Sequence, residues 1–227
     1  MSTKIIVSYD GTNNEEDAIA LGSLLARAGA EVSLGYVRHT DEAVSDEEAQ
    51  EVLDRGAALF AGTFASSHAV TDRSTPEGLR ALAEREGADV IVFCSDSHTA
   101  KGHVSVGNSA QRLLDGGRFA IAIASAGLAE KGELSVSRIS TSEDPSDSSA
   151  SQTAQELAGV FGASVTTAAA GHGAELLVLG SRPEAGEGQV ALSAASMNLI
   201  EDATGAVLVL PRGTAVQFGH ARATVNA

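Results

Sequence analysis

Two groups of polar residues directly follow apolar, strand-like runs of the sequence and could together hold a ligand. The first group is Ser8, Tyr9, Asp10 and Gly11, behind the β-branched run that begins at Ile5. A carboxylate such as that of Asp10 can accept hydrogen bonds from ribose hydroxyl groups, and glycine lets the backbone turn tightly. Taken alone, the pair Asp10-Gly11 is more simply interpreted as an ordinary turn.

The second group follows a later apolar run and consists of residues 94–97 (Cys-Ser-Asp-Ser) and 107–109 (Gly-Asn-Ser). Backbone N–H groups at the start of a helix bind anions, most often phosphate. An ordinary helix cap at Asn108 or Ser109 explains the same residues equally well. Because ligands of open parallel sheets bind beyond the carboxyl ends of the strands, we expect both groups to meet at one edge.

Strands and helices alternate along the chain, which predicts parallel sheets covered by helices on both faces. In the first half the expected strands are Ile5–Tyr9, Glu31–Val37, His68–Asp72, Asp89–Cys94 and Phe119–Ala124. The second half repeats this order in shorter form, with expected strands at Leu134–Ile139, Ala163–Ala168, Glu175–Gly180 and Ala206–Leu210. We infer two tandem copies, the second of which lacks about one helix–strand unit between Ala168 and Gly171.

The expected fold class is α/β: a three-layer α/β/α sandwich with open, mostly parallel, twisted sheets in two tandem domains. The complete domain is expected at residues 1–128 and the abbreviated one at 132–213. Residues 214–227 carry no periodicity and are expected to form a disordered tail.

Composition excludes several classes of protein. Of 227 residues, 43% are hydrophobic, which predicts a buried core rather than a disordered chain. The formal net charge is −15 and the 15 Lys and Arg form no cluster, so nucleic acids and anionic membranes are unsuitable partners. The single cysteine, Cys94, excludes an internal disulfide framework and a cysteine-only zinc site. The N-terminus does not resemble a signal peptide and no apolar run is long enough to span a bilayer, so we expect a cytoplasmic protein.

The chain resembles the universal stress protein family over almost its whole length. The matching segments are IIVSYDGT at residues 5–12, VIVFCS at 90–95, GNSAQRLL at 107–114 and AVLVLPRG at 206–213. This resemblance implies a stress-response role and, in the N-terminal domain, a site for ATP or another adenine nucleotide with Mg²⁺. The family aspartate that meets the nucleotide matches Asp10, and the backbone position on the adenine side falls near Val37.

The glycine-rich motif of the ATP-binding family members is altered in this chain. Those members carry a glycine, two residues, a second glycine, nine residues, and then glycine followed by Ser or Thr. Here this spacing falls on Cys94, Ser97, Gly107 and Asn108, so that only the third glycine remains. A Cβ atom at the replaced positions would crowd the close backbone approach that glycine allows.

Two alternatives therefore stay open for the N-terminal domain. In the first, a degenerate nucleotide site binds an adenine nucleotide and the protein is regulatory. In the second, the chain binds no nucleotide and acts as a dimerisation scaffold or partner-binding module. The residues that the first alternative assigns to the nucleotide are Ser8, Tyr9, Asp10, Val37, Phe93, Cys94, Ser97, Gly107, Asn108 and Ser109.

The resemblance implies a non-binding second copy. Gly180 and Pro183 take the first two motif positions there, and Ile139 stands where the aspartate is expected. Since family members pair through their last strands, Phe119–Ala124 and Ala206–Leu210 are expected to meet edge to edge, giving an internal pseudo-dimer. A further homodimer of two chains is compatible with this arrangement.

No catalytic residues and no metal site are expected. The six histidines are scattered, without a pair at the helical spacing of a zinc site. Slow hydrolysis of the nucleotide would need a general base, for which only Asp96, His98 or His103 lie near the expected phosphates.

Overall fold

The computed structural model describes residues 2–41, 43–60, 64–132, 134–168 and 173–219. Its strands are β1 (Lys4–Ser8), β2 (Glu31–His39), β3 (Phe64–Asp72), β4 (Val90–Cys94), β5 (Ala120–Ala124), β6 (Arg138–Thr141), β7 (Ser164–Thr167), β8 (Leu176–Leu179) and β9 (Ala206–Val209). Its α-helices are α1 (Glu16–Arg27), α2 (Asp46–Ala58), α3 (Thr75–Glu86), α4 (Asn108–Leu114), α5 (Ser149–Phe161) and α6 (Ala194–Glu201). Short 3₁₀ turns span Asn13–Glu15 and Ala129–Lys131.

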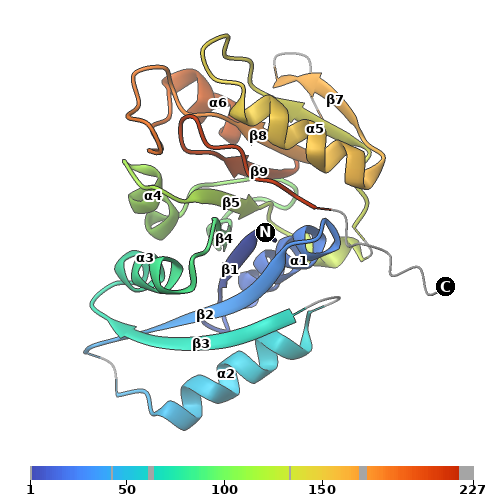
Figure 1. Ribbon diagram of the computed structural model, residues 1–227. Helices are drawn as coiled ribbons and strands as arrows, with labels where there is room; N and C mark the ends of the chain where they lie inside the picture. The colour runs from blue at the N-terminus through green and yellow to red at the C-terminus, as the bar shows by residue number, and fades with distance from the viewer. Residues whose placement is uncertain (1, 42, 61–63, 133, 169–172, 220–227) are drawn as a thin grey trace, which may run out of the picture.

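All nine strands belong to one sheet with the order β3-β2-β1-β4-β5-β9-β8-β6-β7. Helices α1, α2 and α5 cover one face of the sheet and α3, α4 and α6 cover the other (Figure 1). Side chains alternate between the two faces along each strand. In β1, for example, Ile5 and Val7 pack in one apolar cluster and Ile6 packs in the other. The expected three-layer α/β fold is therefore confirmed.

The two halves of the sheet join at β5 and β9. These strands pair antiparallel, with Ile121 opposite Val209 and Ile123 opposite Val207, whereas every other pair in the sheet is parallel. They are the two strands that we expected to meet edge to edge. Their pairing covers two sheet edges that would otherwise expose backbone donors and acceptors.

The second half has the strand order of the first half without its outermost part. The order β7-β6-β8-β9 corresponds to β2-β1-β4-β5, and the described residues hold no counterpart of β3. The chain between Thr167 and Leu176 is too short for another strand with its two flanking helices. This is where the sequence predicts a missing unit.

The structure differs from the expected elements at β3 and β6. Strand β3 begins at Phe64 instead of His68. Strand β6 was expected at Leu134–Ile139 but runs from Arg138 to Thr141. The error at β6 arises because its buried residues include Ser140, whose hydroxyl lies 3.3 Å from that of Thr166 on β7. Apolar patterning cannot locate a strand whose polar side chains are satisfied by hydrogen bonds to its neighbour.

The expectation of a disordered tail at 214–227 is wrong for residues 214–219. The backbone N–H of Val216 donates to Thr153 Oγ1 at 2.9 Å, and that of Phe218 donates to Glu156 Oε2 at 3.0 Å. Both of these apolar side chains are 4% exposed and pack in the cluster beneath α1 and α5. Two apolar residues therefore anchor this segment, and residues 220–227 lie outside the described part of the chain.

Within the described residues, no helix is long and apolar enough to cross a membrane.

Substitution Phe218→Ala should lower the free energy of unfolding by about 3 kcal/mol, since it removes a buried aromatic side chain from the core. Urea denaturation of the full chain measures this difference. The matched control is Gln217→Ala, whose side chain is exposed on the same segment and whose removal should change stability by less than about 0.5 kcal/mol. Equal, small effects of both variants would contradict the anchored tail.

Candidate functional site

A cleft of about 560 Å³ opens beyond the carboxyl ends of β1, β2 and β4. Strand β1 lies between β2 and β4. From β1 the sheet is built outward through β2 and β3 on one side and through β4 and β5 on the other. Such a reversal of strand order creates a crevice at the edge of an open α/β sheet. The position of the cleft is therefore a direct consequence of the strand order.

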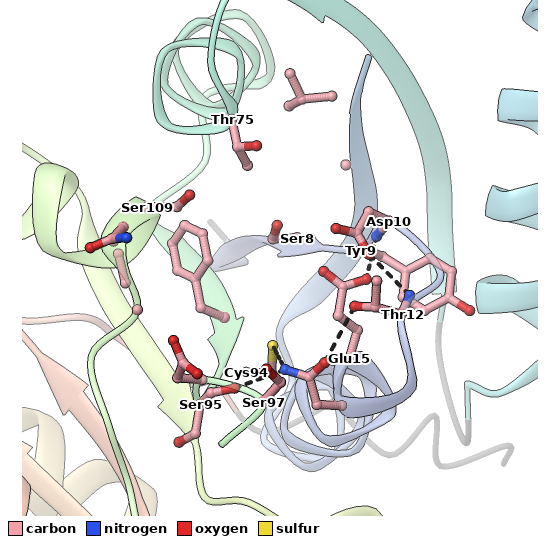
Figure 2. Close-up of a pocket in the computed structure, with 18 of the residues that line it drawn as sticks. Ser8, Tyr9, Asp10, Thr12, Glu15, Thr75, Cys94, Ser95, Ser97 and Ser109 are labelled. Carbon is pink, nitrogen blue, oxygen red and sulfur yellow. Dashed lines mark hydrogen bonds between the residues drawn. The ribbon is translucent and has the colours of Figure 1, made fainter. Parts of the chain in front are cut away.

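Every residue assigned to a nucleotide from the sequence lies on the wall of this one cleft. These residues are Ser8, Tyr9, Asp10, Val37, Phe93, Cys94, Ser97, Gly107, Asn108 and Ser109. Sequence reasoning did not assign the other lining residues, which are Thr12, Asn14, Glu15, Gly35, Tyr36, His39, Thr75, Ser95, Asp96 and Ala110. Most of them neighbour an assigned residue along the chain, whereas Thr75 comes from the start of α3, which the strand-end rule does not cover. Figure 2 shows residues from the ends of β1 and β4 gathered side by side at this cleft.

Glu15 organises the loop between β1 and α1. Its Oε2 atom accepts the backbone N–H of Gly11 at 3.0 Å and also that of Asp10. The side chain is buried, with 7% of the residue exposed. Burial, followed by the proximity of the Asp10 carboxylate, raises the pKa of Glu15 to about 9. Glu15 is therefore a neutral carboxylic acid at pH 7.

Asp10 itself is exposed at the mouth of the cleft. Its Oδ1 atom accepts the backbone N–H of Thr12 at 3.0 Å, which fixes the carboxylate at the turn. This bond is the ordinary turn interaction that the sequence suggests for Asp10-Gly11. The residue thus stabilises the turn and lines the cleft at the same time.

Asn14 connects the loop after β1 with the end of β4. Its side-chain amide donates to the Ser95 carbonyl oxygen at 2.9 Å and to Cys94 Sγ at 3.1 Å (Figure 2). Burial, with a smaller contribution from Glu15, raises the pKa of the Cys94 thiol to about 12. Cys94 therefore stays protonated at neutral pH and behaves as a small packing residue.

The loop between β4 and α4 is held by its own polar groups. The buried hydroxyl of Ser95 donates to the Ala124 carbonyl oxygen at 2.7 Å and accepts the N–H of Ser105 at 3.2 Å. The N–H of Asp96 donates to Ser105 Oγ at 3.1 Å, and Asp96 Oδ1 accepts the N–H of His98 at 3.1 Å. Much of the hydrogen-bonding capacity of this loop is used within it.

Of the groups considered as general bases, Asp96 lines the cleft, whereas His98 and His103 are not among its lining residues. His39 is the histidine on the cleft wall, where its Nε2 atom lies 3.1 Å from Thr75 Oγ1. The described residues contain no group of three or more His, Cys, Asp or Glu side chains that could hold a metal ion.

The second half repeats the hydrogen bonds of the β4–α4 loop. Ser181, which follows β8, donates to the Leu210 carbonyl oxygen at 2.8 Å and accepts the N–H of Ala191 at 3.2 Å. These three residues stand 86 positions after Ser95, Ala124 and Ser105, respectively. The repeat that the sequence indicates is therefore visible in matching contacts.

This repeat corrects the residue that was matched to Asp10. Ile139 pairs with Leu176 on β8 as Ile5 pairs with Val90 on β4, so Ile139 is the counterpart of Ile5 and does not replace the aspartate. Counted from there, the counterpart of Asp10 is Asp144. The match of Ile139 to Asp10 was wrong because β6 begins four residues later than its apolar pattern suggests.

Asp144 is bound by an arginine of the same chain. Its Oδ2 atom lies 3.4 Å from Nη1 of Arg212, and Nη2 of Arg212 donates to Ser146 Oγ at 3.0 Å. Hydrogen bonds from Ser146 and the nearby guanidinium group lower the pKa of Asp144. The second half thus neutralises the carboxylate that stays exposed in the first half.

The variant Glu15→Gln tests the buried acid, because its amide oxygen can still accept the N–H groups of Asp10 and Gly11 but cannot ionise. In the wild type, the unfolded chain loses this proton near pH 4.5 and the folded chain keeps it to about pH 9. The stability of the wild type relative to the variant should therefore fall across this interval, by at most about 1.4 kcal/mol per pH unit. Urea denaturation from pH 5 to pH 9 measures it. The control is Glu16→Gln at the exposed neighbouring residue. If the stability curves of the wild type and Glu15→Gln stay parallel over this pH range, Glu15 is not a neutral acid in the folded protein.

Comparison with known proteins places the fold. No family model matches the sequence, and no curated protein matches it. A solved structure of a candidate universal stress protein from Pseudomonas aeruginosa UCBPP-PA14 has a TM-score of 0.70 at 13% identity, covering 93% of this chain and 94% of that one. A universal stress protein from Archaeoglobus fulgidus DSM 4304 has a TM-score of 0.68 at 15% identity, covering 94% of this chain and 100% of that one. A functionally unknown protein from Pseudomonas aeruginosa PAO1 gives 0.68 at 13% identity, covering 93% of each chain. Over almost its whole length, this chain therefore has the fold of the solved universal stress proteins.

Proposed function

We propose that this chain is a cytoplasmic regulatory protein of the universal stress protein type, whose N-terminal cleft binds an adenine nucleotide without turning it over. The observation that carries this proposal is the convergence of ten separately assigned residues on one cleft at the reversal of strand order. A volume of about 560 Å³ is within the usual range of small-molecule pockets.

Each part of the cleft has a role in this proposal. The exposed Asp10 carboxylate accepts hydrogen bonds from ribose hydroxyls, and the backbone at Val37 borders the adenine. Cys94, Ser97 and residues 107–109 border the phosphates. Mg²⁺ would enter with the nucleotide, bound through its phosphates.

We further propose that residues 1–128 and 132–213 are two tandem copies that meet through β5 and β9 as an internal pseudo-dimer. The matching hydrogen bonds of Ser95 and Ser181 support this division. The second copy serves as the partner of the first and binds no nucleotide, because Arg212 already engages Asp144. The assembly of two chains into a homodimer remains a prediction from the sequence.

A second candidate function is a scaffold or partner-binding module that has lost its nucleotide. The observation that favours it is the charge of the cleft. Two exposed acidic residues, Asp10 and Asp96, line it, while its described lining includes no Lys or Arg to balance the phosphates of a nucleotide.

Thermal unfolding with and without adenine ligands decides between the two functions. Under the first, AMP at 100 times its dissociation constant should stabilise the protein by about 2.7 kcal/mol, a clear rise in Tm. The variant Asp10→Ala should lose this rise, since it removes the carboxylate that meets the ribose.

The matched control is Asp144→Ala, which removes the equivalent carboxylate of the second copy and should keep the rise in Tm above its own ligand-free value. An equal loss in both variants would remove the assignment of the site to the first copy. The absence of any shift in the wild type with AMP, ADP or ATP at millimolar concentration would leave the scaffold as the function.

A further inference from the structure

We propose that the cleft selects against phosphate charge, so that it holds an adenine ligand by its nucleoside and binds adenosine and AMP more tightly than ATP. This inference rests on the proposed adenine site and names the class of ligand that the site accepts. It stands on three observations: the donors of the first loop, the donors of the second loop, and the charges between them.

The loop after β1 directs its backbone N–H groups toward acids of the protein. Those of Asp10 and Gly11 donate to Glu15 Oε2, and that of Thr12 donates to Asp10 Oδ1. Backbone N–H groups are what a loop at a strand end offers to phosphate oxygens. A phosphate at this loop would therefore have to displace the carboxyl of Glu15, which is buried beneath it.

Four backbone N–H groups of the loop after β4 also donate to acceptors of the same loop. The N–H groups of Asp96, His98 and Ser105 donate to Ser105 Oγ, Asp96 Oδ1 and Ser95 Oγ, respectively. The N–H of Thr99 donates to the Asp96 carbonyl oxygen at 2.9 Å. Between Asp96 and Ser105 the loop thus uses these donors itself, and it presents the Asp96 side chain at the cleft wall.

The charges of the lining add to this effect. Asp10 and Asp96 are acidic, and the described lining residues include no lysine or arginine. In the second copy, by contrast, Arg212 lies 3.4 Å from Asp144, the counterpart of Asp10, and neutralises it. Two like charges about 4 Å apart in water repel by about 1 kcal/mol, and each added phosphate increases this repulsion.

The nucleoside end of the cleft offers polar partners to a ligand. Hydroxyl groups of Ser8 and Thr75 line it together with the exposed Asp10 carboxylate (Figure 2). A carboxylate and hydroxyl groups are suitable acceptors for the hydroxyls of a ribose, which carry no charge. The lining therefore favours an uncharged sugar over a polyphosphate.

Isothermal titration calorimetry with adenosine, AMP, ADP and ATP tests the selection, with each ligand measured in EDTA and again with Mg²⁺. We expect affinity to decrease in that order, with ATP at least about tenfold weaker than adenosine in EDTA at low salt. Mg²⁺ should narrow the difference without reversing it. Added NaCl should raise the affinity for ATP and leave that for adenosine unchanged, because salt screens repulsion.

The variant Asp96→Asn isolates the charge, since its amide oxygen can still accept the N–H of His98. It should raise the affinity for ATP several-fold and leave that for adenosine unchanged. The control is Asp202→Asn, an equal change of net charge on an exposed residue of the second half, which should alter neither affinity.

The outcomes separate this inference from the function on which it rests. Tighter binding of ATP than of adenosine, with or without Mg²⁺, would overturn the selection against phosphate and leave the adenine site standing. An Asp96→Asn variant with an unchanged ratio of the two affinities would also overturn it. If none of the four ligands binds, both the adenine site and the selection against phosphate are contradicted.

Discussion

The cleft depends on the parallel pairing of β1 with both of its neighbours. Ile5, Ile6 and Val7 pair with β2 on one side and β4 on the other, and all three strands end at the same edge of the sheet. Residues that are 80 positions apart in the sequence, such as Asn14 and Cys94, come into contact only through this pairing. The antiparallel pairing of β5 with β9 then extends the sheet through the second half, where the same strand order recurs without its outermost strand.

The two halves use equivalent positions in opposite ways. In the first, the aspartate after the strand stays exposed, and a neutral glutamic acid beneath it holds the turn. In the second, the equivalent Asp144 is paired with Arg212. A carboxyl group that is buried beside a second carboxyl group has a raised pKa, and groups with shifted pKa values gather at functional sites more often than elsewhere. This asymmetry supports a ligand in the first half, where the described cleft lining includes no Lys or Arg to pair with Asp10 as Arg212 pairs with Asp144.

Much of this architecture could be predicted from the sequence, because apolar runs and turn residues mark buried parallel strands directly. The strand-end rule found Asp10, Cys94 and Gly107 for the same reason. It could not find Glu15, whose carboxyl reaches back to the turn from the start of a helix, a contact without a fixed sequence spacing. Polar residues also concealed the true register of β6, which led to Ile139 being matched to Asp10 in place of Asp144. The anchored tail was missed because Val216 and Phe218 are too few to form a pattern.

The central claim is that an adenine ligand binds in the cleft between the ends of β1, β2 and β4. The most direct measurement is an NMR titration of the isotopically labelled protein with AMP, following the backbone amides. The account predicts saturable shifts confined to the lining of the cleft, around residues 8–15, 35–39, 94–97 and 107–110. The amides around Asp144 and Arg212 should remain unchanged. Shifts centred on that second region, or no shifts at saturating AMP, would contradict it.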